Sequence, residues 1–139
     1  MKSGVFLAAL VVIGFAAFEL YAATRNGYRM APDFVYGEFI EARRGSLRCG
    51  TPTDEQRTRF AHNYAWARYR AGLHHAESNQ RLSDADVAAW LAEREATLST
   101  EVDAQVDELG CKDPAVRKFS LRFRNLARLS LPAVPADSS

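Results

Sequence analysis

The sequence predicts an all-α protein in which an N-terminal transmembrane or signal-anchor helix precedes a small, disulfide-clamped helical bundle, a hairpin plus a third helix. Three observations lead to this fold class. They are an apolar run at residues 5–23, three later segments with helix caps and helical apolar spacing, and two cysteines, Cys49 and Cys111, that flank the first two of those segments. We divide the 139 residues into a membrane anchor or signal segment (1–24), a juxtamembrane aromatic-rich segment (25–48), a helical bundle (49–131) and a disordered tail (132–139).

The apolar run from Val5 to Ala23 is interrupted only by Glu19. A helix of about 20 apolar residues crosses the hydrocarbon core of a bilayer, so an uncleaved single-span anchor is the first interpretation. A cleaved signal peptide is the alternative, because it also begins with a basic residue and an apolar stretch. Leu20-Tyr21-Ala22 is a poor cleavage site, which favours the anchor.

Recognisable caps precede each of the three predicted helices. Thr53 and Gln56 have the spacing of a capping box, in which each side chain satisfies a free amide of the other residue. Ser83 is a capping residue followed by acids that favour the positive end of a helix dipole. Asp113-Pro114 places a cap residue before a proline at the first helical position. The predicted helices cover residues 54–75, 84–109 and 114–129, the second ended by Gly110 and the third by Pro132.

The two cysteines are expected to form a disulfide. The short polar connection at residues 76–82 predicts that the first two helices are antiparallel neighbours. The start of the first helix and the end of the second then lie together, and with them Cys49 and Cys111. Closing this loop stabilises a fold by about 4 kcal/mol on the chain-entropy model. The alternative is a pair of small buried thiols in a cytosolic protein.

The cysteines also decide the expected compartment. Disulfides persist in the periplasm or outside the cell, whereas the cytosol keeps thiols reduced. Arg25 and Arg29 follow the apolar run and only Lys2 precedes it, so the positive-inside rule alone would keep the body cytoplasmic. We give the cysteines greater weight. The expected location is the inner membrane, single-pass, with the C-terminal domain periplasmic, or a secreted or periplasmic form after cleavage.

The second and third predicted helices each carry one apolar stripe. The stripes comprise Val87, Leu91, Leu98, Val102, Val106 and Leu109 in the second helix, and Val116, Phe119, Phe123 and Leu126 in the third. Arg94 and Glu95 interrupt the first stripe; we interpret Arg94 as reaching solvent from the edge of the stripe, with a buried ion pair as the alternative. The remaining faces are acidic on the second helix and basic on the third, which predicts that these two helices complement each other.

The helix predicted at residues 54–75 has two apolar faces. Phe60, Tyr64, Ala67 and Ala71 form the first, and His62, Trp66, Tyr69 and Leu73 form the second. A helix that is apolar on two sides is either central in its bundle or keeps one side for a partner. One interpretation is that residues 32–44 form a short amphipathic helix, ended by Gly45, that covers the second face. The other is that the second face binds a protein, since Trp and Tyr are frequent interface anchors.

The search for chemistry gives no catalytic, cofactor-binding or metal-ligating residue. His74 and His75 point about 100° apart on a helix, so they cannot both ligate one ion from a rigid face. There is no phosphate-binding glycine loop, nucleophile elbow or CxxC motif. The 18 basic and 17 acidic residues balance, which gives no reason to expect a nucleic-acid binder.

These observations favour a non-enzymatic, membrane-anchored envelope protein that acts as an accessory or adaptor subunit through a protein-binding helical surface. Its expected partners are another envelope protein and the inner membrane, the latter through residues 5–23. The alternative is a secreted or periplasmic inhibitor or immunity-type protein with a cleaved signal peptide. A small envelope enzyme is the third possibility.

Overall fold

Four α-helices and one short 3₁₀ helix make up the part of the chain that the computed structural model describes, residues 30–138. They are α2 (Pro32–Cys49), α3 (Asp54–Ser78), α4 (Asp84–Leu109), α5 (Pro114–Ala127) and η1 (Ala136–Ser138). Residues 30–138 contain no strand, which confirms the all-α class and the helical bundle for this part of the chain. The predicted anchor at residues 1–24 lies outside the described residues. Within them, no helix is both long and apolar enough to cross a bilayer.

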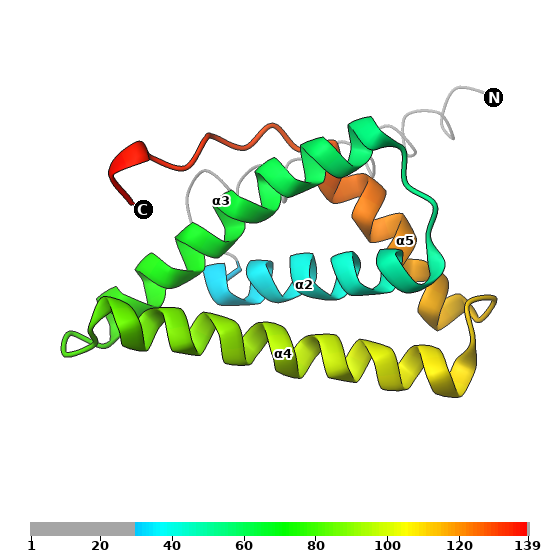
Figure 1. Cartoon of the computed structure of the whole chain (residues 1–139), viewed down its shortest axis with the longest axis horizontal. Coiled ribbons are helices and arrows are strands. Elements are labelled where there is room, and N and C mark those ends of the chain that lie inside the picture. The colour runs from blue at the N-terminus through cyan, green and yellow to red at the C-terminus, as the bar shows by residue number, and fades with distance from the viewer. Residues whose placement is uncertain (1–29, 139) are drawn as a thin grey trace, which may run out of the picture. The chain divides into compact units, whose positions relative to one another are not determined.

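The helices are arranged around α2. In Figure 1, α3 and α4 diverge from the turn that joins them, α2 lies between them, and α5 crosses the wide end. Because α2 and α4 run in the same direction, their C-terminal ends lie together. The predicted hairpin of α3 and α4 is present, but α2 lies between these two helices and separates them away from their turn. The bundle begins at Pro32, so it includes a helix that the boundary predicted at residue 49 left outside.

The predicted caps form as expected. Thr53 Oγ1 accepts a hydrogen bond from Gln56 N (3.2 Å) and Gln56 Oε1 accepts one from Thr53 N (3.0 Å). Ser83 and Asp86 form a second capping box, so Asp86 closes the helix start as well as favouring its dipole. The Asp113 side chain accepts from Ala115 N at 2.8 Å. The predicted helix ends are less accurate than the starts. The helix predicted to end at residue 75 continues to Ser78, and the helix predicted to end at residue 129 stops at Ala127.

Gly45 does not end α2, and this expectation is wrong. The helix continues to Cys49, with Gly45 buried in its interior. A Cβ atom built on Gly45 would lie 2.3 Å from Phe119 Cβ of α5, a distance that real structures do not tolerate. The glycine therefore allows two helices to approach closely rather than giving a left-handed helix terminus.

The core is formed by one face of α2 and the helices around it. Tyr36 and Phe39 of α2 are fully buried, and the Phe39 and Phe60 rings lie 5.4 Å apart. Phe60 of α3 also stacks on Phe123 of α5 at 4.0 Å, with an interplanar angle of 12°. Aromatic rings at these distances add to the stabilisation that burial of their apolar area gives. Three helices thus meet at Phe60, which fixes α3 relative to α2 and α5.

The predicted disulfide is confirmed. Cys49 and Cys111 are bonded, with their Cα atoms 5.3 Å apart and 62 positions apart in the sequence. Its structural basis differs from the expected one. Cys49 is the last residue of α2 and Cys111 follows α4, so the bond joins the ends of two parallel helices instead of closing the hairpin of α3 and α4.

The ion pairs also centre on α2. Arg44 donates to both carboxylate oxygens of Asp103 on α4 at 2.8 and 2.7 Å, and Arg48 binds Asp103 and Asp107 at 2.8 and 2.6 Å. Hydrogen bonds from Arg44, and then from Arg48, lower the pKa of Asp103 to about 2.

The acidic partners on the other side of α2 bind α5. Arg122 binds Glu38 at 2.8 Å and Glu41 at 2.9 Å. The acids on α4 were expected to pair with the bases on α5, and for these residues this expectation is wrong. Asp103 and Asp107 of α4 pair with arginines of α2, and Arg122 of α5 pairs with glutamates of α2.

Gly45→Ala should lower the free energy of unfolding by about 1–3 kcal/mol, because the added methyl group overpacks against Phe119. Gly37→Ala is the matched control in the same helix. Its Cβ would meet only the ends of flexible side chains, the nearest being Arg94 Nη2 at 3.1 Å. Both variants gain the same helix propensity, so urea titrations of the pair isolate the contact with Phe119. Equal stability of the two variants would contradict the close approach of α2 and α5.

Reduction of the Cys49–Cys111 bond should lower the free energy of unfolding by about 4 kcal/mol, because the open chain gains loop entropy in the unfolded state. The measurement is a urea titration with and without a reductant. The double variant Cys49→Ser/Cys111→Ser should match the reduced protein and show no response to reductant. A response in the double variant would assign the effect to something other than this bond.

Candidate functional site

The four predicted partner-binding residues share one side of α3, which we call the outer face: His62, Trp66, Tyr69 and Leu73. At about 100° per residue this side lies opposite the one that packs on α2. The Trp66 and Tyr69 rings contact each other with centroids 5.6 Å apart, and both side chains remain partly exposed. The interpretation that residues 32–44 cover the outer face is wrong, since α2 packs on the opposite side of α3.

The segment after α5 runs back to α3 and is held by two neighbouring side chains. Asn63, 1% exposed, donates to the carbonyl oxygens of Leu126 (2.8 Å) and Leu129 (2.9 Å) and accepts from Leu131 N (3.4 Å). His62 Nε2 donates to Leu131 O at 2.8 Å. One of the four outer-face residues is thus a contact for the C-terminal segment.

A polar network lies at the interface between α2, α3 and α4. The Tyr36 hydroxyl donates to Glu95 Oε2 at 3.2 Å and lies 3.3 Å from the Tyr64 hydroxyl, while Arg43 pairs with Glu95 Oε1. Burial raises the pKa of both tyrosines, so the phenols stay protonated at neutral pH. A tyrosine held neutral donates hydrogen bonds but is a poor base, and we assign this network to packing.

Arg94 and His75, two of the polar residues singled out in the sequence, contact neighbouring residues of the bundle. Arg94 is half-buried and donates to Asp33 O at 3.2 and 3.0 Å. The His75 ring stacks on Trp90 at 4.0 Å, near the turn between α3 and α4. Over residues 30–138 no group of His, Cys, Asp and Glu side chains has the arrangement to hold a metal ion.

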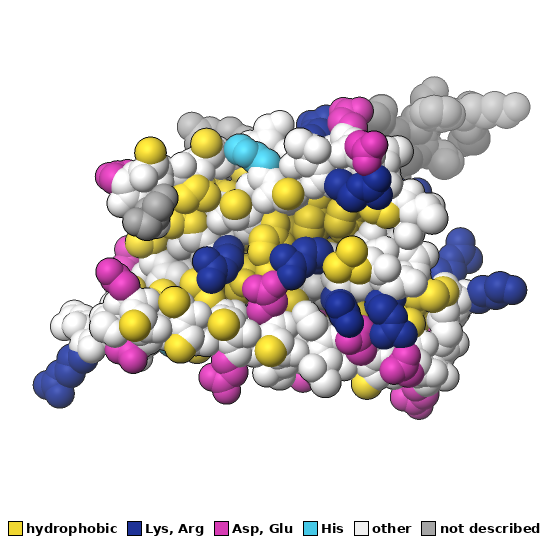
Figure 2. Space-filling view, in the orientation of Figure 1, with side chains coloured by type: hydrophobic (Ala, Val, Ile, Leu, Met, Phe, Trp, Pro, Cys, Tyr) yellow, Lys and Arg dark blue, Asp and Glu magenta, His cyan; other side chains and the backbone are white. Residues whose placement is uncertain are grey.

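An apolar hollow of about 390 Å³ lies between α2 and α3. Its lining includes Leu47 of α2, which is 70% exposed, and Phe60 and Tyr64 of α3. Figure 2 shows apolar side chains exposed between these two helices, beside a row of basic side chains over α2. Arg43 and Arg57 also line the hollow.

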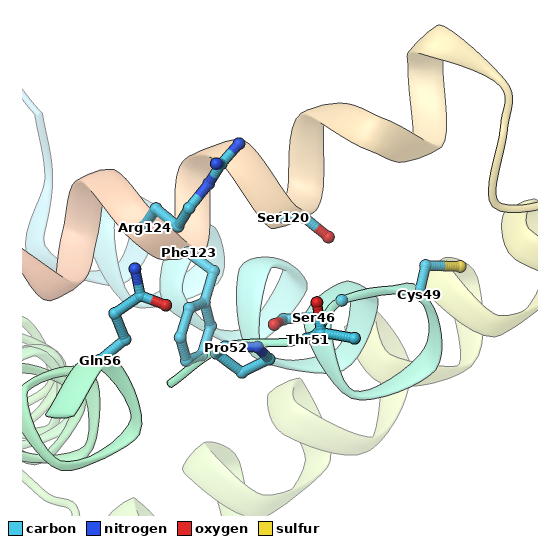
Figure 3. Close-up of a pocket in the computed structure, with 9 residues that line it drawn as sticks. Ser46, Cys49, Thr51, Pro52, Gln56, Ser120, Phe123 and Arg124 are labelled. Carbon is cyan, nitrogen blue, oxygen red and sulfur yellow. The ribbon is translucent and has the colours of Figure 1, made fainter. Parts of the chain in front are cut away.

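A polar hollow of about 240 Å³ adjoins the loop between α2 and α3. Its polar groups come from Ser46, Thr51, Gln56, Ser120 and Arg124. Figure 3 shows the hydroxyl groups of Ser46, Thr51 and Ser120 near one another, with the Phe123 ring between them and Gln56, and with Arg124 on the α5 side of the hollow. Ser46 is 3% exposed, and no described residue hydrogen-bonds either serine hydroxyl.

The sequence analysis predicted neither hollow, for two reasons. It ended the helix at Gly45, so Ser46 and Leu47 were not placed on a helical surface. Phe39, Arg43 and Leu47 follow one another at intervals of four residues, and Ile40 precedes Leu47 by seven. This helical spacing could have extended the predicted helix beyond Gly45. The proximity of Ser46 to Ser120 had no local signal, because these residues are far apart in the sequence.

The fold and surfaces together define a small, disulfide-bonded helical bundle with a partly exposed aromatic face. No family model, curated protein sequence or solved structure matches the chain.

Asn63→Ala should lower the free energy of unfolding by about 1–3 kcal/mol, because Leu129 O loses its donor, while Leu126 O keeps the 3.3 Å bond from Leu129 N. His62→Ala is the matched control on the neighbouring residue. Its side chain is exposed and binds the same segment through one hydrogen bond, so we expect a change within about 0.5 kcal/mol. Thermal and urea unfolding of the two variants measure the difference. Equal effects would contradict the role of Asn63 in holding the C-terminal segment.

Proposed function

We propose that this protein is a non-enzymatic, membrane-anchored envelope protein that serves as an accessory or adaptor subunit and binds another envelope protein through the outer face of α3. The observation that carries this proposal is the Trp66–Tyr69 pair, partly exposed on the side of α3 opposite the core. Trp and Tyr bury a large apolar area and lose little side-chain entropy, so they commonly anchor protein interfaces. Leu73 extends the same face by one helical turn.

The charge beside the aromatic pair favours an acidic partner surface. Arg70 follows Trp66 by four residues, which places it on the adjoining side of the helix. Its side chain is exposed and forms no ion pair with any residue in 30–138. A partner that presents an apolar pocket with a carboxylate at its edge would complement both features.

Two features support the envelope location. The Cys49–Cys111 bond is of the kind that persists in an oxidising compartment. The apolar run at residues 5–23 has the length of a membrane span. Neither feature distinguishes an anchor from a cleaved signal peptide, so the test below includes both forms.

The test is photocrosslinking in cells from position 66 of the full chain, followed by mass spectrometry of the captured protein and fractionation of the membranes. We expect one envelope protein to be captured, in a fraction that resists salt and carbonate washing. Trp66→Ala in a chain crosslinked from position 69 should reduce that capture at least tenfold, since interface Trp residues often contribute more than about 2 kcal/mol. The Trp66→Ala protein should keep its disulfide and its unfolding midpoint.

A crosslinker at position 47 is the matched control, because Leu47 is exposed on a different surface, at the apolar hollow. Capture of the partner from position 47 and not from 66 would overturn the outer-face proposal. Unfolding of Trp66→Ala would assign Trp66 to the core. A soluble form that begins near Ala23 or Arg25 and blocks an enzyme would favour the inhibitor alternative.

A further inference from the structure

We propose that the polar hollow binds a small carboxylic acid as its anion. The inference rests on hydroxyl groups that have no partner, an open space that a glycine maintains, and a cation that no described acid neutralises. It goes beyond the proposed function, because it concerns a different surface and a small molecule.

Gly50 keeps the space between two hydroxyl groups open. A Cβ atom built on Gly50 would lie 2.7 Å from Ser46 Oγ and 3.1 Å from Ser120 Oγ. The two hydroxyls, one from α2 and one from α5, therefore face the same position beside the Gly50 backbone. Ser46, 3% exposed, has no hydrogen-bond partner for its hydroxyl among the described residues, which leaves it free to donate to a bound oxygen atom.

Gln56 contributes a donor whose orientation is fixed. Its Oε1 atom accepts from Thr53 N at 3.0 Å in the capping box of α3. The capping bond uses the oxygen of the amide, so the two hydrogen atoms of Nε2 are available to an acceptor in the hollow. A capping interaction thus sets the direction of a ligand-binding group.

Arg124 gives the hollow its charge. Its neighbour on α5, Arg122, is already paired with Glu38 and Glu41, whereas Arg124 forms no ion pair within residues 30–138. No acidic residue lines the hollow in the described part of the chain. One guanidinium group with hydroxyl and amide donors matches a single negative charge, and arginine binds the planar carboxylate group particularly well. The volume of about 240 Å³ limits the ligand to a small acid.

The test is ¹H–¹⁵N NMR of the full chain titrated with sodium propionate, against sodium chloride at equal ionic strength. We expect saturable shifts of the Ser46, Gly50 and Ser120 backbone amides and of the Gln56 side-chain amide. Arg124→Gln should weaken binding about tenfold, the effect of losing one charge-assisted hydrogen bond. Arg117→Gln, an exposed arginine on the same helix, is the matched control and should bind as the wild type does.

Gly50→Ala is the second variant, because its methyl group would occupy the space between the hydroxyls. It should abolish the propionate shifts while the disulfide and the spectrum of α4 are retained. Absence of saturable shifts in the wild type, or equal weakening by Arg117→Gln and Arg124→Gln, would overturn the proposal. Stronger binding of inorganic phosphate than of propionate would overturn the assignment to a carboxylate.

Discussion

Burial of α2 among α3, α4 and α5 is the constraint on which the rest of the described structure depends. Its inward face places Tyr36 and Phe39 against aromatic residues of α3, and Gly45 lets α5 approach its backbone. Without this helix α3 and α4 would have to pack on each other along their length, but they diverge from their turn (Figure 1). The apolar area that stabilises the bundle is therefore shared mainly through one central element.

The charges of α2 favour one rotation of this helix about its axis. Arginines on one side of the helix reach acids of α4, and acids on another side reach Arg122 of α5. Partly exposed ion pairs contribute little net stability, but a helix rotated or shifted by a turn would place like charges together. The charge pattern thus favours one orientation of α2 in the bundle, and the aromatic contacts add to the stability of that orientation.

Local signals in the sequence were sufficient for the starts of α3, α4 and α5 and for the apolar stripe of α5, whereas the cysteine pair was predicted from an expected hairpin that the bond does not close. Thr53 and Gln56, or Asp113 and Pro114, determine a helix start from neighbouring residues, which is why these predictions are confirmed. The central position of α2 was not predictable in this way. Gly45 ends a helix or allows a close contact depending on a residue of α5 far along the chain. The polar hollow depends on the same long-range packing, so its serines carried no pattern that could be recognised.

The fastening of α2 to α4 has a mechanical consequence. At the start of α2, Arg94 of α4 donates to the carbonyl oxygen of Asp33. At the end of α2, the Cys49–Cys111 bond joins this helix to the loop that follows α4. Tension applied to the chain ahead of Pro32 would shear α2 along α4, loading the Arg94 hydrogen bonds first and the Arg44–Asp103 pair next. Beyond these lie the Arg48 pairs with α4 and, at the end of α2, the covalent Cys49–Cys111 bond, which would still hold the central helix when its weaker contacts had yielded.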